Sequence, residues 1–424
     1  MRRLTLVIVL AGALPLAARA EERFPPPDFE SGYTLPVTTT PPPRSDVLEY
    51  VDVAVLAAAL VAASILVLRV RSRRAVFVLM AFSLAYFGFY RQGCVCAIGA
   101  IQNVTLGLAD PAYTVPLAVV AFFAAPLVFT LLFGRTFCAA VCPLGAIQDL
   151  ALLRPVRVPA WIEHGLGLVP YVYLGLAVLF AATGSAFIIC EYDPFVALFR
   201  RSGSVAMLGL GVGMLLVSVF VGRAYCRFLC PLGAIFKVLS PLAWWHATIT
   251  PAECIRCRLC EDACPFAAIR PPTADAHGPR AAGMGRLAAL LALAPVLVAL
   301  GAGTGRLLAP ALARMHATVR LSDRIRLEEA GEVTETTEAS DAFRIHGSAP
   351  GDLYAEAAGI EAGFGTGGWL LGGWVGLVVA AKLLHLSIRR TRADYLPDRG
   401  RCLSCARCFA YCPVEAKGPK ERKA

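Results

Sequence analysis

The sequence predicts an all-α, polytopic membrane protein with about seven transmembrane helices. Of its 424 residues, 57% are hydrophobic and 17% are charged, whereas soluble globular proteins carry about 25% charged residues. The apolar residues form long blocks instead of an amphipathic scatter, which is the pattern of segments that cross a bilayer. The 15 cysteines recur at regular spacings, so their positions carry most of the information about function.

The first 50 residues are expected to be directed across the membrane. Residues 1–20 have the parts of a secretory signal peptide, with a basic start at Arg2 and Arg3, a short apolar core and an Ala-x-Ala cleavage site at 18–20. An uncleaved anchor helix is the alternative, but the apolar core is short for a span. Residues 21–50 are rich in Pro and Thr and are expected to form an extended exported arm.

Seven apolar segments follow the arm. Each is near the length that crosses a hydrocarbon layer of about 30 Å, and the second is the shortest. Five of them belong to a predicted membrane domain, residues 51–250, and the last two enclose a polar loop. The segments are 51–68, 75–90, 113–133, 165–183, 204–221, 285–305 and 369–388.

Charged residues predict the orientation of these segments. The predicted cytoplasmic stretch 69–74 contains four arginines and the stretch 389–401 contains five, whereas 327–361, predicted to be exported, contains nine acidic residues. This asymmetry follows the positive-inside rule. The net charge of +10 is therefore explained by orientation in a bacterial inner membrane, and no nucleic-acid partner is expected.

Two stretches match the bacterial ferredoxin motif, in which three cysteines at two-residue gaps precede a fourth cysteine and a proline. One runs from Cys254 to Pro265 and the other from Cys402 to Pro413. In two-cluster ferredoxins the fourth cysteine binds the other cluster. Zinc sites do not explain the extra cysteine and proline, and disulfides are disfavoured in reducing compartments. We assign one [4Fe–4S] cluster to Cys254, Cys257, Cys260 and Cys412, and a second to Cys402, Cys405, Cys408 and Cys264.

The predicted topology brings the two motifs to the same side of the membrane. The first motif lies in residues 251–284 and the second in 389–424. Between them lie the transmembrane helix 285–305, the exported acidic loop 306–368 and the transmembrane helix 369–388. Because the chain crosses outward and returns, both motifs are cytoplasmic. The predicted fold is therefore a membrane bundle with a small ferredoxin-like two-cluster domain assembled on the cytoplasmic face.

A second cysteine pattern is an internal repeat inside the membrane domain. Residues 134–147 (GRTFCAAVCPLGAI) and 222–235 (GRAYCRFLCPLGAI) share a Cys-x3-Cys-Pro motif. Positions i and i+4 of a helix lie on one face, so two repeats present four thiols, which suit a third iron–sulfur or other metal site. Buried, unreactive cysteines are the alternative. The four thiols belong to Cys138, Cys142, Cys226 and Cys230.

Three further cysteines, Cys94, Cys96 and Cys190, are predicted to lie on the outer side. Residues 93–103 (GCVCAIGAIQN) partly repeat the Cys-x3-Cys-Pro frame, which indicates a repeated helical unit. A three-thiol metal site, a disulfide involving Cys190 and inert packing are all open interpretations.

The membrane repeats followed by ferredoxin motifs resemble the NosR/NapH family of polytopic iron–sulfur proteins, over residues 50–270 and 395–415. The resemblance implies electron transfer through the membrane, from quinol or a cytoplasmic donor to a periplasmic reductase system such as those of nitrogen-oxide respiration. It implies that the ferredoxin-motif cysteines are cluster ligands. NosR-type members carry a large exported flavin-binding domain, for which residues 21–50 are too short, so a separate flavin-binding subunit is a candidate partner.

We therefore expect an integral-membrane carrier that passes electrons between a cytoplasmic or quinol donor and a periplasmic redox protein docked on the acidic loop. Quinol oxidation, as by a quinol dehydrogenase, needs a proton acceptor. Candidates are Glu191, Asp193 and His164, for which interfacial solvation is the simpler interpretation. His385 lies in the last apolar segment, where an ionisable group indicates function.

The alternative is a redox-active assembly or regulatory factor for a respiratory metalloenzyme. In that function the outer cysteines would handle copper, because soft thiolates select Cu(I).

Overall fold

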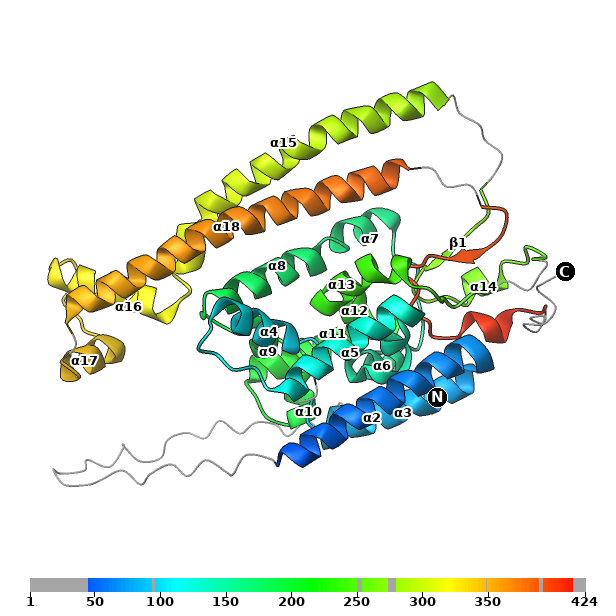
Figure 1. Cartoon of the computed structure of the whole chain (residues 1–424), viewed down its shortest axis with the longest axis horizontal. Coiled ribbons are helices and arrows are strands. Elements are labelled where there is room, and N and C mark those ends of the chain that lie inside the picture. Colours follow the sequence, from blue (N-terminus) through cyan, green and yellow to red (C-terminus); the bar gives the residue numbers. More distant parts are fainter. Residues whose placement is uncertain are drawn as a thin grey trace.

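The computed structural model describes residues 45–93, 96–249, 254–273, 280–347, 349–388 and 392–414, which are mostly helical. Figure 1 shows a bundle of helices from α2 to α13, a long hairpin of α15 and α18 beside it, and loops around α14 and β1 at one end. The predicted signal peptide and nearly all of the exported arm lie outside the described residues.

Within the described residues, five helices are long and apolar enough to cross a membrane: Val47–Val70, Arg73–Tyr90, Ala160–Ala182, Gly283–Ala313 and Pro350–Ser387. The predicted spans near 113–133 and 204–221 correspond to the shorter helices α5 (Leu117–Phe133) and α11 (Val205–Phe220), of 17 and 16 residues. At 1.5 Å per residue these two reach about 25 Å. Within the described residues, the seven expected segments are thus five long helices and two shorter ones.

The bundle consists of helices of uneven length joined by tight turns. The first two spans end in wider π-helical turns at 66–70 and 84–90. The other elements of the bundle are α2 (Asp46–Ile65), α3 (Arg73–Ser83), α4 (Ala100–Ala109), η3 (Phe137–Val141), α6 (Pro143–Ala151), α7 (Ala160–Leu166), α8 (Val169–Ala182), α9 (Ile188–Glu191), α10 (Val196–Arg200), α12 (Ala224–Phe228), α13 (Pro231–Leu239) and η4 (Ser240–Leu242).

The core of the bundle combines large apolar side chains with a few buried charges. Leu60, Met80 and Phe236 are fully buried. Asp52, also fully buried, accepts a hydrogen bond from the Tyr86 hydroxyl at 2.7 Å and pairs with Arg91 at 2.7 Å. Burying an unpaired carboxylate is costly, so these two partners explain how Asp52 is accommodated.

The hairpin is held together by glycines instead of large side chains. Its helices, α15 (Arg280–Ala313) and α18 (Pro350–Ser387), both extend beyond the apolar windows 285–305 and 369–388. A Cβ atom added to Gly301 would lie 2.3 Å from the carbonyl oxygen of Gly372, and one added to Gly305 would lie 2.0 Å from that of Gly368. Such close backbone contact is typical of membrane helix pairs that use small residues.

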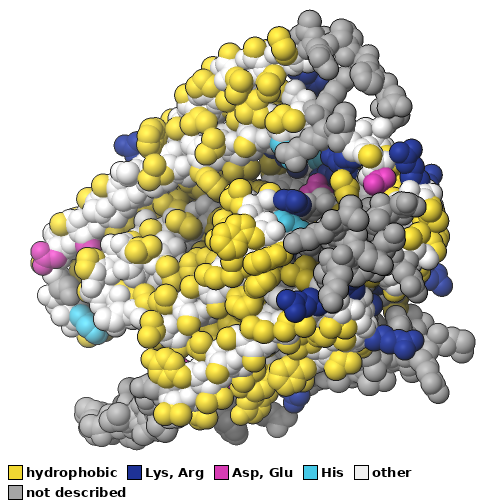
Figure 2. Space-filling model, turned by 45° about the vertical axis from the view of Figure 1, so that its right-hand side comes forward, with side chains coloured by type: hydrophobic (Ala, Val, Ile, Leu, Met, Phe, Trp, Pro, Cys, Tyr) yellow, Lys and Arg dark blue, Asp and Glu magenta, His cyan; other side chains and the backbone are white. Residues whose placement is uncertain are grey.

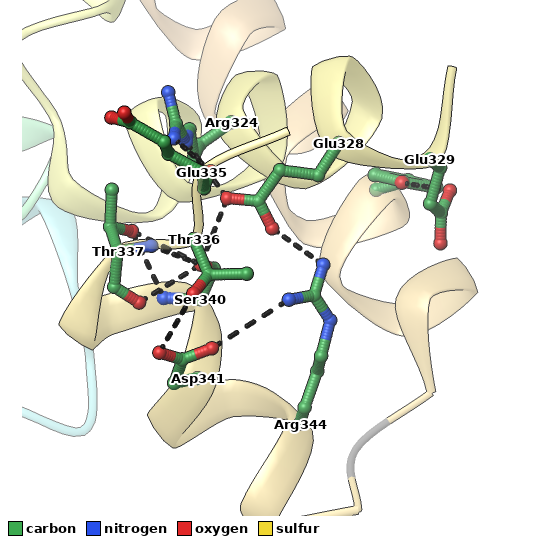
Figure 3. A network of polar contacts seen from close by, with 10 residues as sticks. Arg324, Glu328, Glu329, Glu335, Thr336, Thr337, Ser340, Asp341 and Arg344 are labelled. Atoms are coloured by element: carbon green, nitrogen blue, oxygen red, sulfur yellow. Dashed lines mark hydrogen bonds and ion pairs between the residues drawn. The ribbon is translucent and has the colours of Figure 1, made fainter. Parts of the chain in front are cut away.

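The tip of the hairpin is a folded cap, where the sequence predicts an acidic loop. Helices α16 (Ala317–Glu329) and α17 (Glu338–Ile345) occupy this region. Figure 3 shows the Glu328 carboxylate between Arg324 and Arg344, and it also accepts a hydrogen bond from the Ser340 hydroxyl at 2.9 Å. Thr337 and Ser340 form a capping box at the start of α17.

The two ferredoxin motifs meet at the opposite end of the molecule from this cap (Figure 1). Strand β1 (Ile269–Arg270) pairs antiparallel with β2 (Leu396–Pro397). Arg270 also pairs with Asp398 at 3.2 Å. The first motif contains α14 (Leu259–Asp262) and the second contains the 3-10 turn η5 (Cys408–Tyr411).

The surface agrees with a membrane location. In Figure 2, hydrophobic side chains cover most of the described surface on the face shown, and most Lys and Arg side chains lie toward its right-hand side.

Candidate iron–sulfur centres

Both ferredoxin motifs wrap the backbone in the same way. Arg256 and Arg258 in the first motif have positive φ values of 53° and 66°, and Ser404 and Ala406 in the second have 53° and 60°. In each motif these two left-handed residues flank the second cysteine. Alternation of right- and left-handed residues turns successive N–H groups to one side, which forms the concave backbone found around anions and iron–sulfur clusters.

The structure brings the fourth cysteine of each motif to the first three cysteines of the other. One small pocket is lined by four thiols, with Ile249 and Tyr395 beside them: Cys254, Cys257, Cys260 and Cys412. A neighbouring pocket is lined by the other four: Cys264, Cys402, Cys405 and Cys408. These are the two sets that the motif spacing assigns, and cluster binding at them stays a prediction.

The four cysteine thiols in each pocket are the ligand set of a [4Fe–4S] cluster. Across the described ranges, no group of three or more His, Cys, Asp or Glu side chains converges on one metal ion. Four thiolates around one zinc ion would stand about 3.8 Å apart, given Zn–S bonds of about 2.3 Å. In a cubane each thiolate binds a different iron, so the four sulfur atoms stand further apart.

Burial raises the pKa of thiols in both pockets, to about 11 for Cys260, to about 12 for Cys402, and above its ordinary value for Cys264. Metal ligation requires the thiolate, so loading these pockets with iron would release protons.

The four thiols of the membrane repeats also lie together. Cys142 lies within electrostatic range of Cys138, Cys226 and Cys230. The expected placement of each pair on one helix is wrong, because Cys142 and Cys230 are the N-cap residues of α6 and α13, after a break in the helix. The Gly233 amide donates to the Cys230 sulfur at 3.3 Å. Amides at a helix start favour a thiolate.

Sequence reasoning missed two buried arginines that accompany these thiols. Arg135 and Arg223 occupy the same position of each repeat and are 2% and 0% exposed. Each packs against the other repeat: a Cβ added to Gly145 would lie 3.1 Å from Arg223 Nη1, and one added to Gly233 would lie 3.6 Å from Arg135 Nη2. The repeated Gly-Arg pair was a visible signal of this reciprocal arrangement.

Asp149 joins the membrane domain to the second ferredoxin motif. Its carboxylate lies 2.6 Å from Arg73, 3.0 Å from Arg407 and 3.7 Å from Arg223. Burial alone would raise the pKa of Asp149, but the three guanidinium groups outweigh it and lower the pKa to about 2. Arg407 lies between the second and third cysteines of its motif, so this ion-pair network positions that motif against the bundle.

Glu163 provides a second connection to the same motif. It pairs with Arg227 of the second membrane repeat at 3.2 Å and with Arg401 at 3.0 Å. Arg401 directly precedes the first cysteine of the motif. Arg135 also donates to the Gly400 carbonyl at 3.2 Å.

The three sets of thiols form a continuous packed series. A buried cluster around Ile249 and Tyr395 contains cysteines of both ferredoxin pockets: Cys254, Cys260, Cys264 and Cys408. A second cluster, around Phe266 and Leu403, joins the pocket nearer the bundle to the first membrane repeat through Cys138, Cys264, Cys402 and Cys405. Buried apolar contacts therefore connect the ferredoxin pockets to the membrane thiol Cys138.

On the other side of the bundle, Cys96 and Cys190 lie near one another, while Cys94 lies outside the described residues. A Cβ added to Gly99 would be 3.2 Å from the Cys190 sulfur and 3.8 Å from the Cys96 sulfur. Metal binding or disulfide formation at these thiols stays a prediction.

The four candidate ionisable groups are spread over the molecule. Asp193 is buried and accepts a hydrogen bond from the Phe195 amide at 2.8 Å, whereas Glu191 is exposed. His164 and His385 line a large cavity near the second ferredoxin motif. The structure therefore does not bring these four residues together into one proton-accepting site.

Comparison with known proteins identifies the class. A family model described as a 4Fe-4S binding domain matches residues 115–159 and 204–246, which contain the two membrane repeats. Another 4Fe-4S binding domain model matches residues 247–270, which contain the first ferredoxin motif. With five helices suited to crossing a membrane, these matches place the chain among membrane iron–sulfur proteins.

Within that class, the chain belongs to the NosR/NapH-type polyferredoxin family. It is 30% identical over 190 residues to an uncharacterized protein of Methanocaldococcus jannaschii, a match that covers 43% of this chain and 77% of that protein. It is 31% identical over 216 residues to the regulatory protein NosR of Pseudomonas aeruginosa, covering 45% of this chain and 29% of NosR.

A third relative is the ferredoxin-type protein NapH of Escherichia coli, which is 31% identical over 162 residues, covering 34% of this chain and 53% of NapH. The chain thus matches about half of NapH and less than a third of NosR. No solved structure matches the chain significantly.

Proposed function

We propose that the protein carries electrons across the bacterial inner membrane, between a cytoplasmic or quinol donor and a periplasmic redox partner. Two [4Fe–4S] clusters bound by the ferredoxin motifs supply the one-electron chemistry. Each cluster takes three cysteines from one motif and the fourth from the other. Membership of the NosR/NapH-type family and the ferredoxin-type name of a relative support this function.

One observation carries the proposal: the continuous packing of the three sets of thiols. Cysteines of both ferredoxin pockets share one buried cluster. Cysteines of the pocket nearer the bundle share a second buried cluster with Cys138. Electron transfer is favoured by close, water-free packing between centres. The membrane thiols extend this series toward the bilayer, and we infer that they hold a third metal or iron–sulfur centre.

Fully buried arginines suit the charge of such a centre. Arg223 lies within electrostatic range of Cys226, Cys138 and Cys405. A cluster with four thiolates is anionic, and a buried anion requires a paired cation. Arg135, 2% exposed, donates to the Cys138 sulfur at 3.8 Å.

The proposed orientation places both ferredoxin motifs in the cytoplasm. Four arginines lie between residues 69 and 74 at the end of the first span, and Arg71 donates to the Thr248 carbonyl just before the first motif at 2.7 Å. The acidic cap of α16 and α17 lies at the other end (Figure 1). Basic residues mark the cytoplasmic side. A reporter enzyme fused after Arg344 should therefore read as exported, and a cytoplasmic reading would reverse the orientation.

Cluster composition tests the ligand assignment. Protein purified without oxygen should contain about eight irons from the two ferredoxin motifs, with more if the membrane thiols hold iron. The variant C412S should lose the same electron paramagnetic resonance signal as C257S, because both residues belong to the proposed first cluster. C405S should lose the other signal, and C190S, outside both pockets, should lose neither.

If C412S instead reproduces the spectrum of C405S, the exchange of the fourth cysteine is wrong. Stoichiometric zinc with almost no iron would contradict the electron-carrier function itself. Addition of a reduced quinol analogue to the oxidised protein then tests the donor: quinol oxidation yields two electrons and two protons, so two reduced clusters should appear per quinol consumed.

A further inference from the structure

A cavity of about 1060 Å³ lies beside the second ferredoxin motif. Its walls come from α7, α8 and α13 of the bundle, from the C-terminal half of α18, and from residues 396–403. Its volume is in the range of sites that bind small molecules. Cys226, Phe266 and Leu403 also line it, so the cavity borders the proposed electron path.

The polar wall of this cavity has a large excess of cations. Eight Lys and Arg side chains line it against two carboxylates, Glu163 and Asp398. Both carboxylates are already paired, Glu163 with Arg227 and Arg401, and Asp398 with Arg270. Within the part of the chain that the structure describes, the other five cations have no carboxylate partner: Arg135, Lys237, Lys382, Arg392 and Arg399.

Two buried nitrogen atoms of this wall also lack a partner. Arg135 Nε and His164 Nδ1 are buried without a hydrogen-bond partner among the described residues. Buried polar atoms in native proteins nearly always have partners. An acceptor bound in the cavity would supply one, and would balance the unpaired charge of the cations around it.

Apolar side chains of two candidate membrane spans also line the cavity. Leu168 and Tyr171 come from the start of α8, and Trp374, Leu377 and Val378 come from α18. The Trp374 indole donates to the Tyr171 carbonyl at 2.9 Å. Trp and Tyr are enriched where a span meets the headgroup region, so the cavity joins a basic surface to a lipid-facing one.

We propose that this cavity binds the anionic, phosphate-bearing headgroup of a membrane phospholipid, with the acyl chains lying along α8 and α18. Basic pockets between membrane helices at the cytoplasmic face suit such headgroups, and arginines form strong charge-assisted hydrogen bonds with phosphate oxygens. A neutral quinone ring fits the cavity less well, because it would leave the five unpaired cations without a counter-charge.

Lipid binding to the delipidated, cluster-containing protein in neutral detergent tests this proposal. Native mass spectrometry should show phosphatidylglycerol bound at least tenfold more tightly than phosphatidylcholine with the same acyl chains. The variant K382Q/R392Q removes two unpaired cations of the cavity and should reduce this preference at least tenfold. The control R154Q/R320Q removes two exposed arginines that lie outside the cavity and outside residues 69–74, and it should keep the preference. Unchanged iron content in both variants shows that they fold.

Three results would overturn the proposal. The first is equal binding of the two lipids, and the second is wild-type preference in K382Q/R392Q. The third comes from competitors: if inorganic phosphate or a quinone analogue binds and phosphatidylglycerol does not, the cavity takes a free anion or a quinone instead of a lipid. None of these outcomes depends on the ligand assignment of the ferredoxin motifs, so the electron-carrier function is tested separately.

Discussion

The two membrane repeats, residues 134–147 and 222–235, share an architecture, but the residues that follow them hold different parts of the molecule together. Each has a buried arginine after its first glycine, and each has a cysteine that caps a nine-residue helix, α6 or α13. The arginine of each repeat packs against a glycine of the other. The shared positions are therefore those around the thiols, and they build a nearly two-fold centre.

The two positions that follow each repeat also diverge. Gln148 and Asp149 follow the first repeat, and Phe236 and Lys237 follow the second. Asp149 binds three arginines, one of them from the second ferredoxin motif. Lys237 donates to the Arg227 carbonyl at 3.0 Å and faces the cavity. The positions that the two repeats share therefore surround the thiols. The positions that diverge determine which neighbouring segment or cavity each repeat contacts.

Among the residues that distinguish the two repeats, replacing Asp149 should cause the largest loss of stability. The variant D149L leaves Arg223, which is fully buried, without its carboxylate, and an unpaired buried charge costs about 3–5 kcal/mol. Denaturation in detergent should show this loss, together with release of the second ferredoxin motif to proteolysis. D262L is the matched control, because Asp262 and its partner Arg157 are 60% and 65% exposed and exposed pairs contribute about 0–1 kcal/mol. Equal losses in the two variants would contradict a special role for Asp149.

Lowering the pH should gradually remove the stability that the Asp149 carboxylate contributes. The folded-state pKa of Asp149, about 2, is below its ordinary value of 3.8, so its stabilisation is complete above pH 4 and is lost as the pH falls toward 2. The loss amounts to about 2–3 kcal/mol, from about 1.4 kcal/mol per pKa unit. Denaturation of wild type and D149N should therefore converge between pH 4 and 2. A constant difference across that range would show that the carboxylate charge is not responsible.

The smallest loss of stability is expected when Gln148 is replaced. Its side-chain oxygen accepts from the Tyr225 amide at 2.9 Å, and its nitrogen donates to the Cys226 sulfur at 3.4 Å. The variant Q148L leaves that buried amide without an acceptor, which costs about 1–3 kcal/mol. F236L, at the equivalent position of the other repeat, changes packing without exposing a polar group. If Q148L alters the signal of a centre at Cys226 and F236L does not, the contact to sulfur is functional.

The cysteine sets were predictable because they depend on short-range spacing and on the even number of membrane crossings between the two motifs. Spacing assigns three ligands to each motif, and two intervening spans return the chain to the same side. The two pockets contain the same sets of four cysteines. The helical character and the family were also predictable, since long apolar blocks and repeated Cys-x3-Cys-Pro motifs are local signals.

The ion pairs that hold the motifs to the bundle were not predictable. Asp149 and Arg407 are far apart in the sequence, and nothing local distinguishes either from an ordinary surface charge. The extent of α18 was hidden for another reason: its first half, from Pro350, is rich in Gly and acidic residues, which hydropathy assigns to a loop. The pairing of Gly301 and Gly305 with the glycines of α18 depends on the approach of two backbones, which leaves no hydrophobic pattern.

The hairpin of α15 and α18 imposes an order of events during biosynthesis. Strand β1 precedes the hairpin and its partner β2 follows it, so the first motif leaves the ribosome long before the strand that completes its surroundings. In the proposed topology, the first motif completes its pocket only after both legs of the hairpin have crossed the membrane. Formation of both proposed metal centres would then depend on the last two crossings.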